Sequence, residues 1–368
     1  MPSNTAAYIP ARSARLEVKS APYTQPCEIE IVVKNGAIAI NPLDYLKQDM
    51  GNIMFGWIKY PFIMGSDTAG EVVEIGKGVT RFKVGDRVLG HAVSMDKRSN
   101  KASEGAFQEY TVLRTNMASP IPSSLSYEQA CVLPLTLSSA ACGLFMKDYL
   151  ALPYPSLSPK PNGKTLLVWG GSTSVGSNAI QLAVASGHEV ITTSSPKNFD
   201  YVKNLGAKEV FDYRSATAVK DIIHASQNRQ FAGAIAIGTG STKACMEILA
   251  ACKGTKFIAQ ASIDMPDEMP TSALGWVANG LSMGAGMGAM MVKSKLKRVG
   301  MKFIFGSDDM ANEVGDLIYK DFLPAALAEG KYIVAPEPQV VGKGLERVQE
   351  AFDLYKKGVS AKKVVVTL

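Results

Sequence analysis

Residues 166–183 read LLVWGGSTSVGSNAIQLA, and the fold of the surrounding chain follows from this stretch. An apolar run ends at Gly170 and Gly171, a tight polar turn follows, and Gly176 opens a helical pattern. The amides and the positive dipole end at such a helix start suit a pyrophosphate. Gly171 and Gly176 fit the dinucleotide fingerprint G-x-G-x-x-G, but Thr173 takes the place of its middle glycine. A purely structural strand-to-helix turn remains the alternative interpretation.

Strand and helix patterns alternate on both sides of this loop. Short apolar strands separated by helical crossovers require a parallel sheet that is covered on both faces. Six strands of this kind predict a doubly wound nucleotide-binding domain. The predicted strands span residues 165–169, 189–193, 209–212, 232–237, 256–259 and 301–305, and the clearest helices span 177–186, 199–205, 218–227 and 241–250.

The two ends of the chain differ from this middle part. Residues 28–34 (EIEIVVK) alternate polar and apolar side chains, as half-buried strands do, and no long amphipathic helix is evident before residue 122. The last seven residues, KKVVVTL, predict a strand that returns to this β-rich, barrel-like module. We therefore expect a catalytic domain formed by residues 1–127 and 312–368, into which a dinucleotide-binding domain, residues 128–311, is inserted.

Two helical segments and one apolar stretch complete the prediction. Residues 128–147 are rich in alanine and leucine and predict a helix, and another helix follows Asn312 and runs to about Glu329. Residues 273–292 are almost uncharged, but glycine and methionine dominate them. This composition favours a flexible apolar pocket wall over a membrane span.

Composition narrows the function classes. The chain has 368 residues, 46% of them hydrophobic, which rules out global disorder, and its net charge of +6 is spread along the sequence. We expect no nucleic-acid partner and no membrane. Five widely spaced cysteines form no disulfide framework and no zinc knuckle, and the N-terminus lacks the apolar core of a signal peptide. A cytoplasmic location is the resulting expectation.

The second strand of the inserted domain indicates which cofactor is used. NAD-specific sites place an acidic side chain near the end of this strand. Here Ser195 and Lys197 occupy that place, and no acid occurs before Asp200. A hydroxyl and a lysine suit a 2′-phosphate, and Tyr213 and Arg214 after the third strand add a phenol and a second cation. We expect NADPH/NADP+. The alternative for Lys197 is a solvated lysine at a helix start.

Several motifs occur together in a characteristic order. They are NPLD at residues 41–44, GSDTAGEV at 65–72, GDRV at 85–88 and GAFQEY at 105–110, followed by the nucleotide loop. With them the chain resembles the medium-chain dehydrogenase/reductase superfamily over nearly its whole length. The resemblance implies an α/β fold with a GroES-like β-barrel catalytic domain and an inserted Rossmann domain. Within the superfamily the chain is most similar to fungal zinc-independent members, which are relatives of the trans-acting enoyl reductases of polyketide synthases.

The same resemblance bears on metal binding. Zinc-dependent alcohol dehydrogenases have a cysteine near the position of Asn41 and a histidine-glutamate pair near Ser66 and Asp67. A structural zinc lobe would also need four clustered cysteines. This sequence lacks both ligand sets, so we expect no catalytic metal.

The resemblance further implies which residues form the site. Lys47, Ser139 and Tyr45 are the candidates for catalysis, and Tyr110 is a further candidate proton donor. Ser139 stands where relatives present a threonine to the nicotinamide and phosphate, and its alternative role is a helix N-cap. The cofactor contacts that we expect are Asn41, Pro42, Asp44, Ser139, Gly171, Ser172, Thr173, Ser174, Val175, Gly176, Ser195, Lys197, Asn198, Tyr213, Ile237, Gly238, Ser360 and Ala361.

The sequence thus predicts an NADPH-dependent reductase of a conjugated C=C bond in an enoyl thioester or enone. The resemblance alone implies that it acts in fungal secondary metabolism. Quinone or ketone reduction and zinc-free alcohol oxidation remain open as one alternative. A cofactor-retaining protein that performs no redox chemistry, or a structural partner of a synthase, is the second alternative. The expected partner is a small molecule, either free or carrier-bound, with docking to a synthase open. Monomer and homodimer both remain open.

Overall fold

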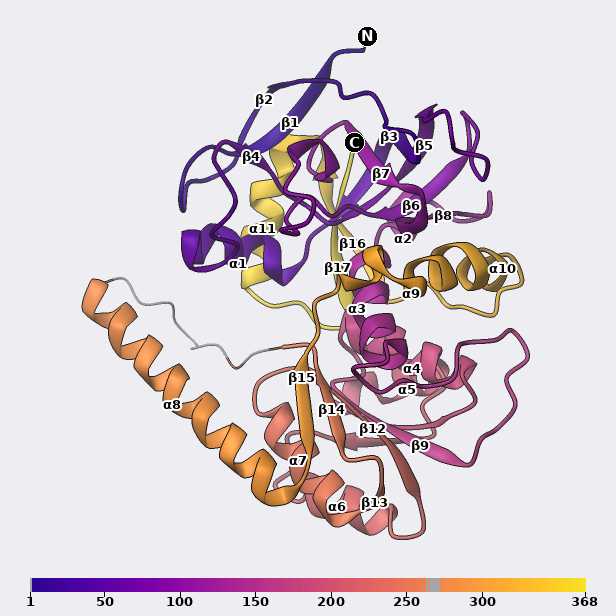
Figure 1. Ribbon diagram of the computed structural model, residues 1–368, viewed down its shortest axis with the longest axis vertical. Coiled ribbons are helices and arrows are strands. Elements are labelled where there is room, and N and C mark those ends of the chain that lie inside the picture. Colours follow the sequence, from indigo (N-terminus) through magenta and orange to yellow (C-terminus); the bar gives the residue numbers. More distant parts are fainter. Residues whose placement is uncertain (1, 263, 265–271) are drawn as a thin grey trace. The chain divides into compact units, whose positions relative to one another are not determined.

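The computed structural model describes residues 2–262, 264 and 272–368, and their contacts form two compact units (Figure 1). Unit 1 comprises Met1–Ser138 and Gly306–Leu368, and unit 2 comprises Ser139–Phe305. The sequence predicts boundaries near residues 127 and 312, whereas the contacts change at 138/139 and 305/306. The first difference arises because helix α3 (Pro134–Phe145) begins among the side chains of unit 1.

Unit 2 is built on a parallel sheet with the strand order β11-β10-β9-β12-β14-β15. The order reverses between β9 and β12, and in open α/β sheets ligands bind at the carboxyl ends of the strands at such a reversal. The strands are β9 (Lys164–Trp169), β10 (Glu189–Ser194), β11 (Glu209–Asp212), β12 (Gln230–Ala236), β13 (Lys253–Gly254), β14 (Phe257–Gln260) and β15 (Gly300–Phe303).

The helices of unit 2 follow the predicted alternation. They are α4 (Ser174–Ala185), α5 (Phe199–Asn204), α6 (Ala218–Ala225), α7 (Ser241–Ala251) and α8 (Ala273–Lys297). All six predicted strands are present with shifts of at most two residues at either end. The doubly wound fold class is therefore confirmed. The main shift is at α4, which begins three residues before the predicted start because Thr173 caps it.

Helix α8 differs from the expected flexible wall. Residues 273–297 form one continuous helix, whose N-cap Ser272 accepts a hydrogen bond from the Gly275 amide at 3.0 Å. Near its other end, Lys293 pairs with Glu247 of α7 at 2.9 Å. In the part of the chain that the structure describes, no helix combines the length and the apolar character needed to cross a membrane.

Unit 1 contains a seven-stranded sheet, in which β16-β17-β3-β5-β6-β8 are consecutive neighbours and β7 pairs with β3, and a small sheet ordered β2-β1-β4. The final strand lies antiparallel to β3, with Val366 opposite Ile38, so the tail returns to the β-rich module. The strands are β1 (Asn4–Ile9), β2 (Glu17–Ala21), β3 (Glu30–Ala39), β4 (Phe62–Ile63), β5 (Asp67–Ile75), β6 (Arg87–His91), β7 (Tyr110–Arg114), β8 (Ala118–Pro120), β16 (Glu337–Lys343) and β17 (Lys362–Thr367).

The helices of unit 1 correct the sequence prediction in three places. Helix α1 (Pro42–Met50) was not predicted. The predicted helix over residues 128–147 is two helices, α2 (Tyr127–Ala130) and α3, because Pro134 starts a new helix at its first position. The predicted helix after Asn312 is also divided, into α9 (Glu313–Asp316), a π-helical turn η6 (Leu317–Phe322) and α10 (Leu323–Ala328). Helix α11 (Val348–Lys356) precedes the last strand.

A buried amide joins three strands of the larger sheet. The Asn35 side chain donates to the carbonyls of Ala106 and Gln108 at 3.1 and 2.7 Å, and to the Thr111 hydroxyl at 2.8 Å. Its oxygen accepts from the Thr68 hydroxyl at 2.6 Å. Every polar group of this amide is therefore paired in a site that is only 5% exposed.

We expect Asn35→Ala to lower the free energy of unfolding by about 2–4 kcal/mol, because it leaves several buried partners without hydrogen bonds. Urea unfolding followed by circular dichroism measures this loss. Asn52→Ala is the control, since Asn52 is exposed and accepts one bond from Tyr60, and it should change stability by less than about 0.5 kcal/mol. Equal effects of the two substitutions would contradict the role assigned to Asn35.

Candidate functional site

The predicted phosphate loop lies at the carboxyl end of β9 in unit 2. Thr173 is the N-cap of α4, where its hydroxyl oxygen accepts from the Gly176 amide at 3.0 Å and its O–H donates to the Gly170 carbonyl at 2.8 Å. A Cβ on Gly176 would lie 2.2 Å from the Gly170 oxygen, so only glycine fits there. Thr173 thus replaces the expected middle glycine with a capping side chain, and the loop keeps its tight geometry.

The amides that follow this cap are those a phosphate would use. Ser174 and Val175 lie in the first turn of α4, where a helix leaves its N–H groups without intrahelical partners. Ser172 precedes the cap, and all three residues are partly exposed. This arrangement fits an anion at the positive end of the helix dipole.

The residues proposed for the adenosine phosphate meet at the neighbouring strand ends. Strands β10 and β11 pair in parallel with Ser194 opposite Asp212, so the segments that follow them are adjacent. Ser195 is buried at the end of β10, and Lys197 is exposed. The Tyr213 hydroxyl accepts a hydrogen bond from the Arg214 guanidinium at 3.2 Å. Asn198 donates to the Ser195 hydroxyl at 3.3 Å, which links two of the predicted contacts.

The next strand brings two more predicted residues to the same edge. The Ile237 amide donates to the Trp169 carbonyl at 3.1 Å, and the Gly238 amide donates to the Ser262 hydroxyl at 2.6 Å. The structure thus gathers, along the carboxyl edge of the sheet of unit 2, Gly171, Ser172, Thr173, Ser174, Val175, Gly176, Ser195, Lys197, Asn198, Tyr213, Ile237 and Gly238.

Ser139 lies inside α3 rather than at its start. The helix begins at Pro134, so the N-cap role considered for Ser139 is wrong. The contact with nicotinamide that we expect for Ser139 stays a prediction.

In unit 1 the predicted contacts surround a buried ion pair that the sequence did not reveal. Lys363 Nζ lies 2.8 Å from Asp67 Oδ2, and both side chains are at most 2% exposed. The side-chain amide of Asn41 donates to the same Asp67 oxygen at 2.8 Å through its nitrogen, and its oxygen accepts from Lys363. The other Asp67 oxygen accepts from the Leu135 amide at 2.6 Å. Both the nitrogen and the oxygen of the Asn41 side chain therefore take part in this network.

Asp44 closes a capping box with Asn41. Asp44 Oδ2 accepts from the Asn41 amide at 2.8 Å, while Oδ1 is fully buried and has no hydrogen-bond partner among the described residues. Pro42, another predicted contact, occupies the first turn of α1. Burial raises the pKa of Asp44 to about 8, and the charge of the neighbouring Asp67 adds to the increase. The hydrogen bond from the backbone N–H of Asn41 acts in the opposite direction and lowers this pKa. Asp44 thus carries a proton at neutral pH.

Lys47 and Tyr45 lie on the same helix in different surroundings. The Lys47 ammonium is buried and donates to the carbonyls of Gly51, Met54 and Phe55 at 2.9, 2.9 and 3.2 Å. Since these bonds use all three of its protons, this geometry holds the loop after α1. Tyr45 is partly buried, and burial raises the pKa of its phenol, which therefore keeps a proton to donate.

Ser360 and Ala361 precede the strand that carries Lys363. Ala361 has a φ of +51°, a left-handed conformation that costs a non-glycine residue about 1 kcal/mol. The strain stands two residues before the buried ammonium, which the turn helps to place. Both residues stay predicted cofactor contacts.

The side chains of Asn41, Ser66 and Asp67 do not form a metal-ligand set. At the positions where zinc enzymes have ligands, Asn41 and Asp67 bind the Lys363 ammonium, and Ser66 replaces a histidine. Among residues 2–262, 264 and 272–368, no three histidine, cysteine or acidic side chains cluster in a way that could hold a metal.

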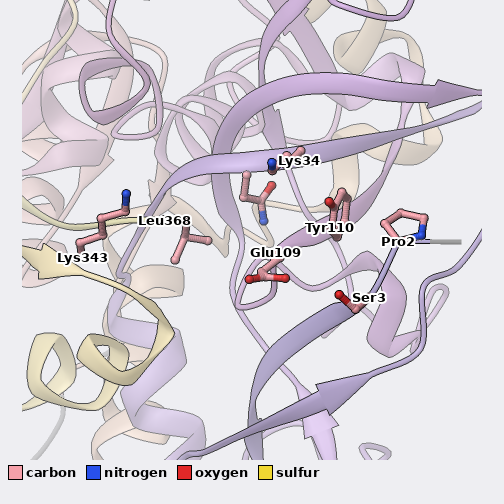
Figure 2. Close-up of a pocket in the computed structure, with 8 residues that line it drawn as sticks. Pro2, Ser3, Lys34, Glu109, Tyr110, Lys343 and Leu368 are labelled. Atoms are coloured by element: carbon pink, nitrogen blue, oxygen red, sulfur yellow. The ribbon is translucent and has the colours of Figure 1, made fainter.

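A pocket of about 470 Å³ lies elsewhere in unit 1 (Figure 2). Its wall includes Lys34, Glu109 and the candidate donor Tyr110, together with Lys343 and Leu368. It contains none of the predicted cofactor contacts, so we do not take it as the active site.

Asp44→Asn tests the protonated carboxyl. The native chain retains a proton that the unfolded chain releases near pH 4, so the wild type should lose stability relative to the variant between about pH 4 and pH 8. Between pH 4 and pH 8, the free energy of unfolding of the wild type should fall by about 2 kcal/mol or more relative to that of Asp44→Asn. Urea unfolding of both proteins across this pH range measures the change.

Asp353→Asn is the control with the opposite sign. The pKa of Asp353 is lowered by the hydrogen bond and charge of Arg15, although burial acts against this. Its removal should cost stability above about pH 4, by a small amount because the pair is exposed. A pH-independent effect of Asp44→Asn would contradict the protonated state.

Comparison with known proteins agrees with this geometry. The family described as "Alcohol dehydrogenase GroES-like domain" matches residues 28–123, and "Zinc-binding dehydrogenase" matches residues 174–305. "Dehydrogenase pigH" of Monascus ruber is 54% identical over 370 residues and covers 100% of both chains. "Trans-enoyl reductase himH" of Aspergillus japonicus is 40% identical, covering 99% of this chain and 97% of its own.

A solved structure shares the fold. An alcohol dehydrogenase superfamily protein from Novosphingobium aromaticivorans superimposes with a TM-score of 0.73 at 23% identity, covering 99% of each chain. The two family matches and the full-length relatives agree with the barrel, the inserted sheet and the order of motifs, and on these grounds the chain belongs to the medium-chain dehydrogenase/reductase superfamily.

Proposed function

We propose that this oxidoreductase uses NADPH to reduce a conjugated C=C bond, in an enoyl thioester or enone, without a catalytic metal. The observation that supports it most directly is the Lys363 ammonium bound to Asp67 and Asn41. A cation fixed at the ligand positions of zinc enzymes leaves no Lewis acid to polarise an isolated carbonyl. Conjugation activates the β-carbon without one.

The nucleotide-binding edge supports NADPH. The amides of Ser174 and Val175 suit the pyrophosphate, and Ser195 and Lys197 suit a 2′-phosphate. Bound NADPH supplies hydride to the β-carbon, and the α-carbon takes a proton, so the product gains two hydrogens while NADP+ forms.

The chain must then provide the proton and shield the reaction from water. Tyr45 keeps its phenolic proton at neutral pH, and we propose it as the donor, with Ser139 orienting the nicotinamide. Lys47 donates its three protons to backbone carbonyls, so we assign it to holding the loop after α1.

We further propose a secondary-metabolite substrate, either free or bound to a carrier, because relatives of this chain include a protein named trans-enoyl reductase. Docking to an acidic carrier domain would use Lys295, Lys297 and Arg298 at the end of α8, since Lys293 is paired with Glu247. We place this activity in the cytoplasm.

The deciding experiment follows the loss of NADPH absorbance with purified enzyme on enoyl thioesters, enones, ketones and quinones, with and without EDTA. We expect turnover of conjugated substrates, unchanged by EDTA. Turnover of only ketones or quinones would favour the first alternative, and tight NADPH binding without turnover would favour a non-redox role. Loss of activity with EDTA would overturn the metal-free proposal.

Lys197→Ala tests the choice of cofactor. Removing the cation should raise KM for NADPH about tenfold and leave KM for NADH unchanged, since only NADPH carries the 2′-phosphate. Lys203→Ala, an exposed lysine in the last turn of α5, is the matched control and should change neither value. An equal rise for both cofactors in Lys197→Ala would contradict the assignment.

A further inference from the structure

A buried polar cluster lies beside the first turn of α3 and includes no predicted cofactor contact. His91 Nδ1 lies 3.0 Å from the Ser138 hydroxyl, which lies 2.8 Å from the Tyr319 hydroxyl. Asp309 is close to Ser138 and completes the cluster. All four side chains are at most 2% exposed.

The cluster holds the start of α3 from several segments of unit 1. Tyr319 donates to the Pro134 carbonyl at 2.8 Å, Asp67 accepts from the Leu135 amide at 2.6 Å, and Ser138 bonds to His91 and Tyr319. Three points within five residues fix both the position and the rotation of this helical turn.

Tyr319 is itself firmly placed. It lies in the π-helical turn η6, a form that is rare and often found at functional sites. The Arg81 guanidinium donates to its carbonyl at 3.0 Å and also to the carbonyls of Thr115 and Ala118. A residue 181 positions away in sequence is thus held rigidly against Ser138.

Ser139 follows Ser138 directly, about 100° further around the helix. Because the Ser138 side chain is anchored in the core of unit 1, the direction of the Ser139 side chain is fixed as well. Rotation of this turn would move the Ser139 hydroxyl.

Asp309 is the uncompensated member of the cluster. Neither carboxylate oxygen makes a hydrogen bond of normal geometry to the described residues, although the nearby Ser138 hydroxyl favours the ionised form. Burial raises the pKa of Asp309 to about 7, and the charge of Asp308 adds to the increase. The pKa of His91 is lowered by burial to about 4, so His91 is neutral.

The charged groups that face this cluster are already paired. Asp67 pairs with Lys363, while Asp96 and Asp308 both pair with Arg98. The Ser138 hydroxyl is therefore the side-chain donor that favours an ionised Asp309, beside the backbone amides of Asp309 and Met310.

We propose that Ser138 is a positioning residue that sets Ser139 for the nicotinamide cofactor, and that an ionised Asp309 withdraws the Ser138 proton from the Tyr319 hydroxyl oxygen and loosens the turn. The first half rests on the proposed function, because it takes Ser139 as a cofactor contact. The second half concerns only unit 1.

Two variants and two measurements test the proposal. Tyr319→Phe removes one hydroxyl and keeps the ring, and Tyr23→Phe, whose hydroxyl donates to Glu74 at 2.8 Å in the same unit, is the matched control. NADPH affinity is measured by fluorescence titration, and hydrogen exchange of the first turn of α3 is measured by mass spectrometry and corrected for the intrinsic pH dependence.

We expect Tyr319→Phe to weaken NADPH binding about tenfold and to speed exchange in residues 134–140, with Tyr23→Phe like the wild type. Unchanged hydrogen exchange in a folded Tyr319→Phe variant would overturn the proposal that Tyr319 holds the first turn of α3. Faster exchange with unchanged NADPH affinity would overturn the link to Ser139. If the wild type binds no NADPH, both the proposed function and the positioning of Ser139 for the cofactor are overturned. The hydrogen-exchange measurement would still show whether Tyr319 holds the first turn of α3.

Asp309→Asn tests whether ionisation of Asp309 loosens the first turn of α3. In the wild type, exchange of this turn should quicken and NADPH binding should weaken several-fold between pH 6 and pH 8.5, as Asp309 ionises. Asparagine cannot ionise, so the variant should show neither change beyond that of the cofactor itself. The same pH dependence in both proteins would overturn the role of Asp309.

Discussion

The buried ion pair between Lys363 and Asp67 ties together four segments of unit 1. Lys363 comes from the last strand, Asp67 from the start of β5, Asn41 from the turn before α1, and the Leu135 amide from α3. Burying two charges is expensive, and such a pair is retained only when further hydrogen bonds satisfy the remaining lone pairs. Asn41 and Leu135 provide those bonds. Removal of either charge would leave the other unpaired in the core, at a cost of about 3–5 kcal/mol.

Burial sets the ionisation of the groups beside this pair. Burial and the charge of Asp67 raise the pKa of Asp44 to about 8, while Lys363 acts in the opposite direction, so Asp44 retains a proton. His91 lies opposite Asp67 across β5 and β6, and burial lowers its pKa to about 4 although the charge of Asp67 raises it, so His91 stays neutral. The two charges of the pair act in opposite directions on each neighbour, and the loss of solvent is the largest cause.

Local patterns were enough to predict the sheet of unit 2. Its strands are short, apolar and separated by helices, and the cap at Thr173 and the glycines of the loop act within a few residues of one another. The predicted cofactor contacts in this unit meet at one edge because parallel strands end together. Helix α1 was missed because its nine residues are too few for a clear period, although Asn41 and Asp44 form a capping box.

Local sequence patterns do not predict contacts between residues that are far apart in the chain. Asp67 and Lys363 are separated by most of the chain, and neither has a neighbour that marks it as half of an ion pair. The break before α3 is different, because Pro134 is the seventh residue of the predicted 128–147 helix, where a proline breaks a helix, and the sequence prediction overlooked this signal. Lys47 is a catalytic candidate by sequence, and only the structure locates the three carbonyls that accept hydrogen bonds from its ammonium.

The two units thus contribute different kinds of chemistry. Unit 2 presents backbone amides and an exposed lysine, which suit the phosphates of a cofactor and require no unusual ionisation. Unit 1 provides groups whose protonation is set by burial around one fixed cation. A conjugated substrate demands little more than hydride and one proton. A core that keeps a phenol and a carboxyl protonated, with the Lys363 ammonium held by Asp67 and Asn41, is suited to the proposed reduction of a conjugated bond.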